Sequence, residues 1–214
     1  MSTFKEKAVS FLMSRIGKTA HVNYTTYITD HLLAISVYLP DGMVWRSCQH
    51  MKCATGKHAF RDYTIASWDV TTQTATLLID VAHEGTGSNW ARALQPEQTF
   101  SYGIGGGFHQ PTAADNLVCI GDASAIAHFV SLYNRRNAGQ HFDTLIIGKP
   151  LPATVLDMPV TPADTLAQLP AWLKGLDLKE TTFYVAGNIP LVVESRKMLK
   201  QLGWKQIKSS GFWE

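Results

Sequence analysis

The sequence predicts a two-domain chain of the β plus α/β class, in which an antiparallel sheet or barrel precedes a Rossmann-like parallel α/β half. Two features of the hydrophobic pattern predict this class. Between about residues 20 and 110, apolar and polar residues alternate in five or six segments, which is the pattern of half-buried strands. From residue 116 onward, buried strands alternate with helices, which is typical of a parallel sheet covered on both faces. The length of 214 residues leaves room for two small domains.

The first half is expected to consist mainly of strands. The alternation is clearest over residues 35–39 and 75–81. A stripe of apolar residues over 4–15 predicts an amphipathic helix ahead of the strands, and a short second helix is expected around 89–94. The glycine-rich stretch 103–107 lacks the spacing of a dinucleotide fingerprint, and no capped helix follows it, so we interpret it as a flexible strand or barrel connection.

The second half is expected to alternate between strands and helices. Residues 117–120 predict a buried strand ending at Gly121, and apolar residues at helical spacing follow it. Thr161 and Pro162 are residue types that open helices, so a helix is expected to begin there. The change of pattern over 109–115 predicts a domain boundary, with a barrel domain at 1–112 and an α/β domain at 113–214. The remaining expected elements are strands at 144–147 and 183–186 and helices at 126–133 and 191–202.

Composition excludes several classes of function. The 19 basic and 17 acidic residues give a net charge of +2, and no cluster of Lys and Arg marks a nucleic-acid surface. The three cysteines form no CxxC pair and the eight histidines form no HExxH pair, so no metal site is expected. No apolar run approaches the roughly 18–20 residues of a membrane span. We therefore expect a soluble, cytoplasmic, monomeric protein without a metal, nucleic-acid or membrane partner.

The first candidate site is the segment Arg61-Asp62-Tyr63-Thr64. Arg61 and Tyr63 are two residues apart on an expected strand, so they point to the same face, whereas Thr64 points to the other. A cation beside an aromatic ring suits a phosphorylated aromatic cofactor. The alternative is an exposed strand on which a cation lies over a ring.

The second candidate site is the segment 83–90, which has the residue types of a strand end, a glycine-rich turn and a helix start. Backbone amides at such a helix N-terminus bind phosphates, and Ser88 can add a hydroxyl donor. The alternative is a plain Ser or Asn cap after a loop.

The third candidate site combines two strand ends of the second half. Small residues over 121–125 would let a phosphate or a nicotinamide approach the backbone closely, and Gly187-Asn188 repeats the theme later in the chain. The alternative in both places is tight packing of a strand against a helix.

Taken in order, these motifs and the closing Ser210-Gly211-Phe212-Trp213 resemble the siderophore-interacting proteins of the ferredoxin–NADP reductase superfamily. The resemblance extends over roughly residues 20–214. It implies a six-stranded antiparallel β-barrel that binds FAD, a following α/β domain that binds NADH or NADPH, and reduction of ferric siderophores in the cytoplasm during iron transport.

The resemblance also implies a role for each candidate residue. Arg61 would pair with the FAD pyrophosphate, Tyr63 would stack on the isoalloxazine, and Thr64 would bond near its N5 edge. The helix turn that would hold the phosphates contains His83, Gly85, Gly87, Ser88 and Trp90. The residues that would line the nicotinamide site are Gly121, Asp122, Ser124, Ala125, Gly187 and Asn188.

Two further residues are expected near the flavin and the substrate. Trp213 would close the site from the C-terminus, and Lys52 is a candidate for the positive field that attracts an anionic chelate. The chemistry is flavin-centred, so no catalytic acid, base or nucleophile of the protein is expected. The alternatives are a reductase whose acceptor is free flavin, flavodoxin or ferredoxin, and a non-catalytic FAD or siderophore carrier in which Asn188 has removed hydride transfer.

Overall fold

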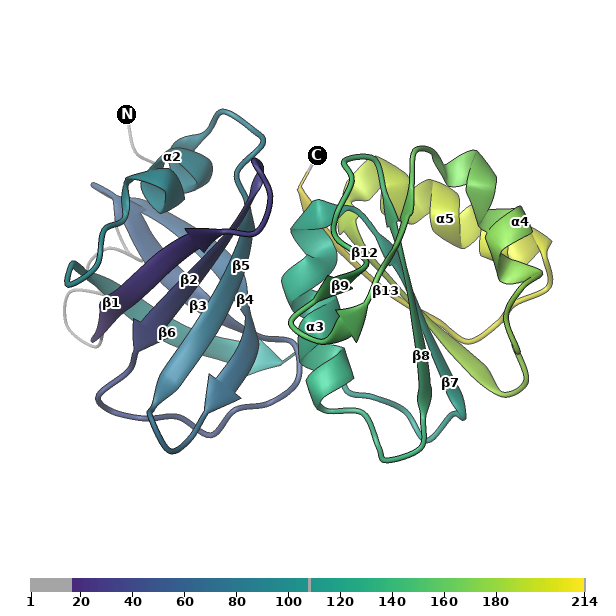
Figure 1. Cartoon of the computed structure of the whole chain (residues 1–214), viewed down its shortest axis with the longest axis horizontal. Helices are drawn as coiled ribbons and strands as arrows, with labels where there is room; N and C mark the ends of the chain where they lie inside the picture. Colours follow the sequence, from purple (N-terminus) through teal and green to yellow (C-terminus); the bar gives the residue numbers. More distant parts are fainter. Residues whose placement is uncertain (1–16, 108, 214) are drawn as a thin grey trace. The chain divides into compact units, whose positions relative to one another are not determined.

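The computed structural model describes residues 17–107 and 109–213, and the chain forms two compact units, Met1–Phe108 and His109–Glu214 (Figure 1). The division falls at residues 108/109, four residues before the predicted 112/113. The helix expected over residues 4–15 lies outside the described residues.

The first unit is a closed antiparallel barrel of six strands, as expected (Figure 1). Neighbouring strands follow the order β1-β2-β5-β4-β3-β6, and β6 pairs with β1 to close the barrel. The one described helix of this unit, α2 (Thr86–Ala93), lies between β5 and β6 in the sequence. The strands are β1 (Lys18–Tyr27), β2 (Leu32–Tyr38), β3 (Gln49–Gly56), β4 (Ala59–Asp69), β5 (Thr74–Asp80) and β6 (Thr99–Gly107).

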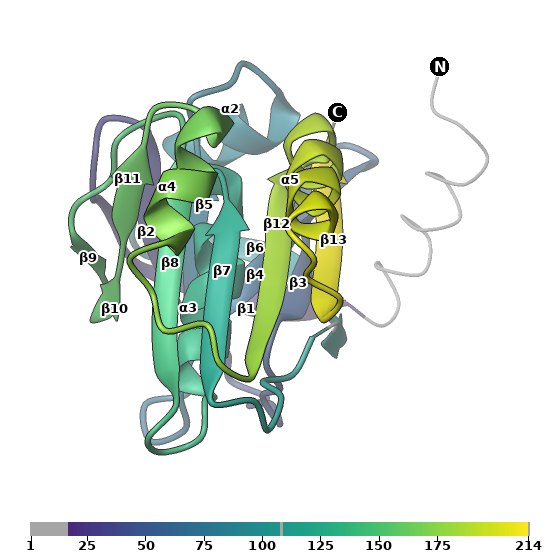
Figure 2. The same ribbon diagram turned by 90° about the vertical axis from the view of Figure 1, so that its right-hand side faces the viewer.

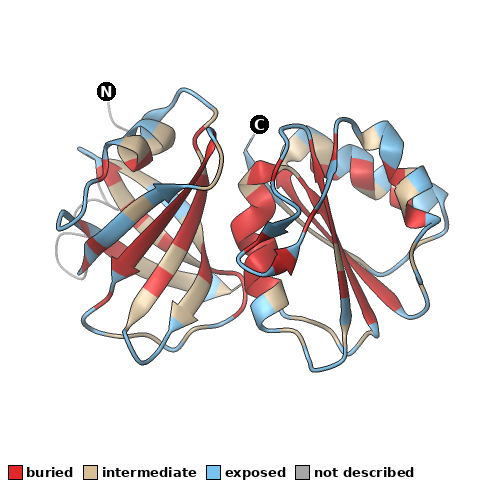
Figure 3. Cartoon of the chain, in the orientation of Figure 1, coloured by how far each residue is buried: buried red, intermediate tan, exposed pale blue. Residues whose placement is uncertain are grey.

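The barrel is filled by the inward half of each alternating strand. Val37, Met51 and Leu77 are among the fully buried residues of this core, and Figure 3 shows how buried positions run along the strands. Burial of this kind stabilises a fold by roughly 25 cal/mol per Å² of apolar surface. Ala91 of α2 belongs to the same cluster and Trp90 packs against it, so α2 is fixed to the barrel by its apolar side.

The second unit is a five-stranded parallel sheet in the order β11-β8-β7-β12-β13 (Figure 2). Its strands are β7 (Asn116–Gly121), β8 (His141–Ile147), β11 (Thr161–Ala163), β12 (Thr181–Asn188) and β13 (Ile207–Trp213). A small hairpin of β9 (Thr154–Val155) and β10 (Met158–Pro159) follows β8. The helical elements are η1 (Ala123–Ala125), α3 (Ile126–Asn134), η2 (Leu166–Gln168), α4 (Leu169–Leu173) and α5 (Ile189–Gln201).

Helices cover both faces of this sheet, as the alternating pattern predicted. Leu173 of α4 and Val192 of α5 pack with Phe183 in one core cluster. On the other face Gly121 lies against Phe129 of α3, since a Cβ at position 121 would come 3.0 Å from that ring. Figure 2 shows α4 and α5 on the near side of the sheet.

The prediction that a helix begins at Thr161 is wrong. Thr161–Ala163 form β11, which pairs in parallel with β8 at the edge of the sheet. Pro162 is tolerated because an edge strand leaves one row of N–H groups without a ladder partner. The helical turn begins at Leu166 instead, where the Gln168 side chain accepts a hydrogen bond from the Thr165 amide at 3.1 Å.

Other differences are smaller. The short helix expected around 89–94 begins at Thr86, the glycine-rich stretch 103–107 lies inside β6, and β13 was not expected as a strand. No described helix is both long and apolar enough to cross a membrane.

Candidate functional site

Helix α2 begins directly at the glycine-rich turn and has an open N-terminus. Its N-cap is Gly85, no described side chain caps it, and its first turn carries no acid. The first main-chain bond of the helix runs from the Asn89 N–H to the Gly85 carbonyl, at 2.9 Å. Uncapped amides at a helix N-terminus attract anions. The alternative of a Ser or Asn cap is not found, because neither Ser88 nor Asn89 caps the helix.

Arg61 and Tyr63 lie beside this open turn, on the same face of β4 as predicted. A Cβ added at Gly87 would come 2.6 Å from the Tyr63 hydroxyl and 3.2 Å from Cγ of Arg61. The glycine is therefore required by the close approach of two side chains from another element. The structure brings the first two candidate motifs into direct contact and places a guanidinium-bearing side chain next to free amides.

Tyr63 is held in this position by Trp90 of α2. The two rings are stacked, with centroids 5.5 Å apart and planes 12° from parallel, and Trp90 in turn meets Phe100 edge-on at 5.1 Å. The Tyr63 hydroxyl is inaccessible to solvent and has no hydrogen-bond partner among the described residues. Burial raises the pKa of this hydroxyl, the buried Cys53 raises it further and Arg61 lowers it, so Tyr63 stays neutral. An orphaned donor next to an open helix N-terminus fits a ligand with acceptor oxygens.

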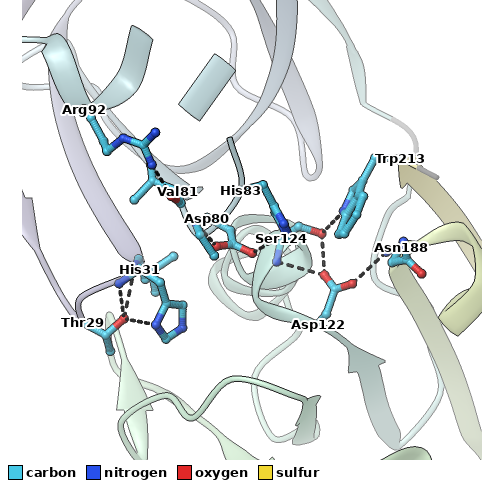
Figure 4. Close-up of polar contacts among 12 residues, drawn as sticks. Thr29, His31, Asp80, Val81, His83, Arg92, Asp122, Ser124, Asn188 and Trp213 are labelled. Carbon is cyan, nitrogen blue, oxygen red and sulfur yellow. Dashed lines mark hydrogen bonds and ion pairs between the residues drawn. The ribbon is translucent and has the colours of Figure 1, made fainter. Parts of the chain in front are cut away.

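The loop that leads into α2 is fixed by contacts that the sequence did not reveal (Figure 4). Arg92 donates to the Val81 carbonyl at 2.7 Å and pairs with Glu84 at 3.3 Å. His83 faces the buried carboxylate of Asp80 at 3.5 Å. Arg92 was missed because a basic residue in the last turn of a helix is an ordinary surface feature, and nothing in the spacing marks its partners.

Thr64 and Lys52 lie on the outer face of the barrel, whereas Tyr63 points toward its core cluster. Lys52 is the cross-strand partner of Asp62 and forms an ion pair with it at 2.7 Å, so its positive charge is compensated locally. Thr64 is the cross-strand partner of His50, whose Nε2 is 3.8 Å from Asp62.

In the second unit, Asp122 joins two strand ends (Figure 4). Its Oδ1 accepts hydrogen bonds from the Ser124 amide, at 3.0 Å, and from the Ser124 hydroxyl, while its Oδ2 accepts from the Asn188 amide at 2.9 Å. Gly187 adopts a φ of +121°, and a Cβ there would come 2.7 Å from Asp122. The third candidate motif is thus one hydrogen-bonded cluster at the carboxyl ends of β7 and β12.

The cluster extends to the last strand and to α5. The Trp213 indole donates to the Ser124 hydroxyl oxygen at 3.1 Å, and the Asn188 side chain caps α5 by accepting from the Leu191 amide at 3.4 Å. From β7 the chain builds outward to β8 and β11, and it then returns to the other side of β7 with β12 and β13. The strand order therefore reverses beside β7, and open α/β sheets bind ligands at the carboxyl ends of the strands at such a switch point.

The chemistry of this cluster favours a polar but uncharged group. The Asp122 carboxylate already accepts a hydrogen bond from the Ser124 amide, and its negative charge would repel a phosphate. A carboxamide or a hydroxyl group of a ligand fits beside it. Gly121 also allows the strand to pack tightly against its neighbours, which was the alternative interpretation of this segment. A Cβ at position 121 would overlap the Ala186 carbonyl and come 3.0 Å from Ala125.

A buried histidine pair lies in the same unit. His128 of α3 is fully enclosed, its Nε2 is 3.0 Å from Nδ1 of His109, and the Phe212 ring lies 5.6 Å away. Burial, with a smaller contribution from His109, lowers the pKa of His128 to about 3. Burial and, secondarily, Lys208 also lower the pKa of His109, so both imidazoles are neutral near pH 7.

Comparison with solved structures identifies the fold of the chain. No family model matches the sequence, and no curated protein matches it. Among solved structures, the chain is similar to a siderophore utilization protein from T. fusca, with a TM-score of 0.75 and 17% identity over 92% of both chains.

Two other structures extend this likeness. The siderophore-interacting protein SipS from Aeromonas hydrophila has a TM-score of 0.74 and 17% identity, over 92% of this chain and 91% of that one. A ferredoxin NADP+ reductase from Neisseria gonorrhoeae, solved with bound FAD and NADP, has a TM-score of 0.69 and 16% identity, over 91% and 98%. The chain therefore has the fold of siderophore-interacting proteins and ferredoxin–NADP reductases, and the expected fold is confirmed.

Proposed function

We propose that the protein is an FAD-dependent NAD(P)H oxidoreductase that reduces ferric siderophores in the cytoplasm. The observation that carries the proposal is the contact of Arg61 and Tyr63 with Gly87, which joins a cation and an aromatic ring to an uncapped helix N-terminus. This combination suits a diphosphate linked to an aromatic ring system.

In the barrel, the chain's own residues bind and orient FAD. The amides of Gly87 and Ser88 and the guanidinium of Arg61 hold the diphosphate, and the Tyr63 hydroxyl gains the partner that it lacks in the described residues. One face of the Tyr63 ring is covered by Trp90, so the isoalloxazine stacks on the other. His83, Gly85 and Trp90 shape the turn. The Thr64 side chain lies on the opposite face of β4 from Tyr63, so the expected contact of Thr64 with the N5 edge does not fit this placement.

In the α/β unit, the cluster around Asp122 receives the nicotinamide end of NADH or NADPH. The Ser124 hydroxyl and the end of β12 at Gly187 and Asn188 offer hydrogen bonds to a carboxamide, and Gly121 and Ala125 keep the approach free of bulky side chains. Trp213 covers this end of the sheet through its bond to Ser124.

Bound FAD supplies the conversion from hydride transfer to single-electron transfer. The protein contributes placement, the exclusion of water and the local field. Ferrous iron binds hard oxygen ligands less tightly than ferric iron because of its lower charge, so reduction would release the metal. Since Asp62 compensates Lys52, Lys52 contributes little net attraction for an anionic chelate.

The proposal is tested by purifying the protein and adding FAD, then mixing the flavin-loaded protein anaerobically with NADH and with NADPH. Reduction by either nucleotide, followed by reoxidation with a ferric siderophore, supports the proposal. A flavin that resists both nucleotides indicates the carrier alternative.

A reductase for a protein acceptor is the second candidate, and the likeness to a ferredoxin NADP+ reductase favours it. The two candidates differ in the oxidant. Faster reoxidation by flavodoxin or ferredoxin than by ferric chelates would identify the protein acceptor as the substrate.

A further inference from the structure

Helix α5 presents basic side chains on its exposed side. Val192 and Leu199 of this helix are buried in the core cluster that they share with Phe183, which fixes one side of α5 to the sheet. Lys197 and Lys200 are exposed, and their spacing of three residues places them on one face of the helix. Figure 2 shows α5 on the near side of the sheet. The helix is therefore held by its buried side and carries these lysines toward solvent.

The exposed side of α5 is hollowed. The residues that line the hollow, here called the basic stripe, are Val193, Arg196, Lys197, Lys200 and Gln201. Three of them carry a positive charge and none carries a negative one. Val193 is 53% exposed, so an apolar side chain lies open to solvent among the cations.

The basic stripe is separate from the hydrogen-bonded cluster around Asp122. Asn188, which belongs to that cluster, caps the first turn of α5. At a rise of about 1.5 Å per residue, Arg196 lies roughly 12 Å along the helix axis from Asn188, and Gln201 lies roughly 20 Å from it. The stripe therefore lies outside the proposed nicotinamide site.

The positive charge of the stripe is only partly compensated. Glu194 lies 3.9 Å from Lys197, and both side chains are well exposed, so this ion pair is weak. Within residues 17–107 and 109–213, no ion pair involves Lys200 or Arg196, and Nε of Arg196 has no hydrogen-bond acceptor. The segment 189–213 contains five basic residues and one acidic residue, a local charge of +4 in a chain whose total is +2. The surplus of positive charge in the chain therefore lies in this segment.

We propose that the basic stripe of α5 docks on an anionic phospholipid surface. Lysines and arginines close to an anionic bilayer are attracted by its negative surface potential, and a basic helix face is typical of this kind of binding. The exposed Val193 adds a small apolar contact between the headgroups. We expected no membrane partner because no segment is long enough to span a bilayer, but a helix that lies on the surface does not need that length.

Two other occupants fit the stripe less well. Protein interfaces are enriched in aromatic residues and arginine and depleted in lysine, whereas the stripe has two lysines, one arginine and no aromatic residue. Sites for small molecules enclose most of the ligand, whereas the described lining of this hollow comes from one helix. A broad anionic surface can meet all three cations at once.

The first test measures binding of the full chain to phospholipid vesicles by flotation at low ionic strength. Wild type should float with vesicles of equal parts phosphatidylglycerol and phosphatidylcholine, and it should stay in solution with phosphatidylcholine alone. Lys197→Gln combined with Lys200→Gln should weaken binding about 25-fold, since each cation contributes about fivefold. The matched control combines Lys57→Gln with Lys149→Gln, which removes the same charge from two exposed lysines outside the stripe and should retain binding within about twofold.

The second test changes the acid and the arginine of this helix face. Glu194→Gln removes the carboxylate next to Lys197 and should strengthen vesicle binding about fivefold, a gain that a damaged fold would not produce. Arg196→Lys keeps the positive charge and should retain vesicle binding, because a lipid surface responds to charge and does not require the planar guanidinium fork.

The outcomes decide the occupant. Equal binding of wild type to both kinds of vesicle, or equal losses from the two lysine pairs, overturns the proposal. Displacement from vesicles by inorganic phosphate at constant ionic strength, together with loss of binding in Arg196→Lys, would identify a site for a small anion instead. Binding of a polyglutamate peptide without binding to vesicles would identify an acidic protein as the occupant and would also overturn it. None of these measurements depends on FAD, so the proposed function is tested separately.

Discussion

Replacing Tyr63 by phenylalanine should stabilise the flavin-free protein and weaken FAD binding. The substitution keeps the ring that stacks on Trp90 at 5.5 Å and removes only the hydroxyl, which is buried without a partner among the described residues. A buried, unsatisfied polar group costs roughly 1–3 kcal/mol, so we expect the free energy of unfolding to rise by about 1 kcal/mol.

The same substitution should have the opposite, unfavourable effect on FAD binding. A phosphate or ribityl oxygen that accepts from the Tyr63 hydroxyl contributes about 1 kcal/mol, so its loss should raise the Kd for FAD about fivefold. Urea denaturation of flavin-free protein and a fluorescence titration with FAD measure the two effects. The control is Tyr24→Phe, which alters an exposed tyrosine of β1 and should change neither quantity by more than about 0.5 kcal/mol. Lower stability of the flavin-free variant together with unchanged FAD affinity would refute the reasoning.

Three further predictions concern the turn, the strand ends and the buried histidine. Gly87→Ala should weaken FAD binding about tenfold, because the new Cβ lies 2.6 Å from the Tyr63 hydroxyl; an unchanged Kd in the same titration would contradict this. Asp122→Asn should lower the free energy of unfolding of the α/β unit, measured in urea, by about 2 kcal/mol. The two carboxylate oxygens accept hydrogen bonds from the Ser124 and Asn188 amides, whereas asparagine has one oxygen and an NH2 group that cannot accept the second bond. Burial lowers the pKa of His128 to about 3, so the unfolded chain binds the extra proton between about pH 6.5 and 3. Stability should therefore fall as the pH drops through that window, by at most about 1.4 kcal/mol per pH unit. The variant His128→Gln should flatten this fall, as measured by thermal unfolding at several pH values.

Most of the fold could be predicted because the period of the hydrophobic pattern distinguishes strands from helices. The alternation over 75–81 became β5, and the helical spacing after Gly121 became α3. The exceptions have local causes. Thr161 and Pro162 have the composition of a helix start, yet they form the edge strand β11, because pairing with β8 is a tertiary contact that no local pattern records.

The site could be predicted in its motifs but only partly in its geometry. Sequence spacing gave the common face of Arg61 and Tyr63, yet the stacking of Tyr63 on Trp90 and the contact with Gly87 depend on how α2 packs on the barrel. The pairing of Lys52 with Asp62 follows from strand register, which the sequence does not specify.

A similar limit applies to Gly105. Gly106 and Gly107, which follow it, are the same residue type, and only the position of the His50 ring, which a Cβ at Gly105 would overlap, distinguishes Gly105 from Gly106. No signal in the glycine-rich stretch could have identified this contact.

Anaerobic reductive titration of the FAD-loaded protein tests the central claim most directly. The account predicts that FAD binds stoichiometrically, that NADH or NADPH bleaches its absorbance, and that a ferric siderophore restores the oxidised spectrum with formation of ferrous iron. A protein that retains no FAD after reconstitution, or whose bound flavin neither nucleotide reduces, would contradict it.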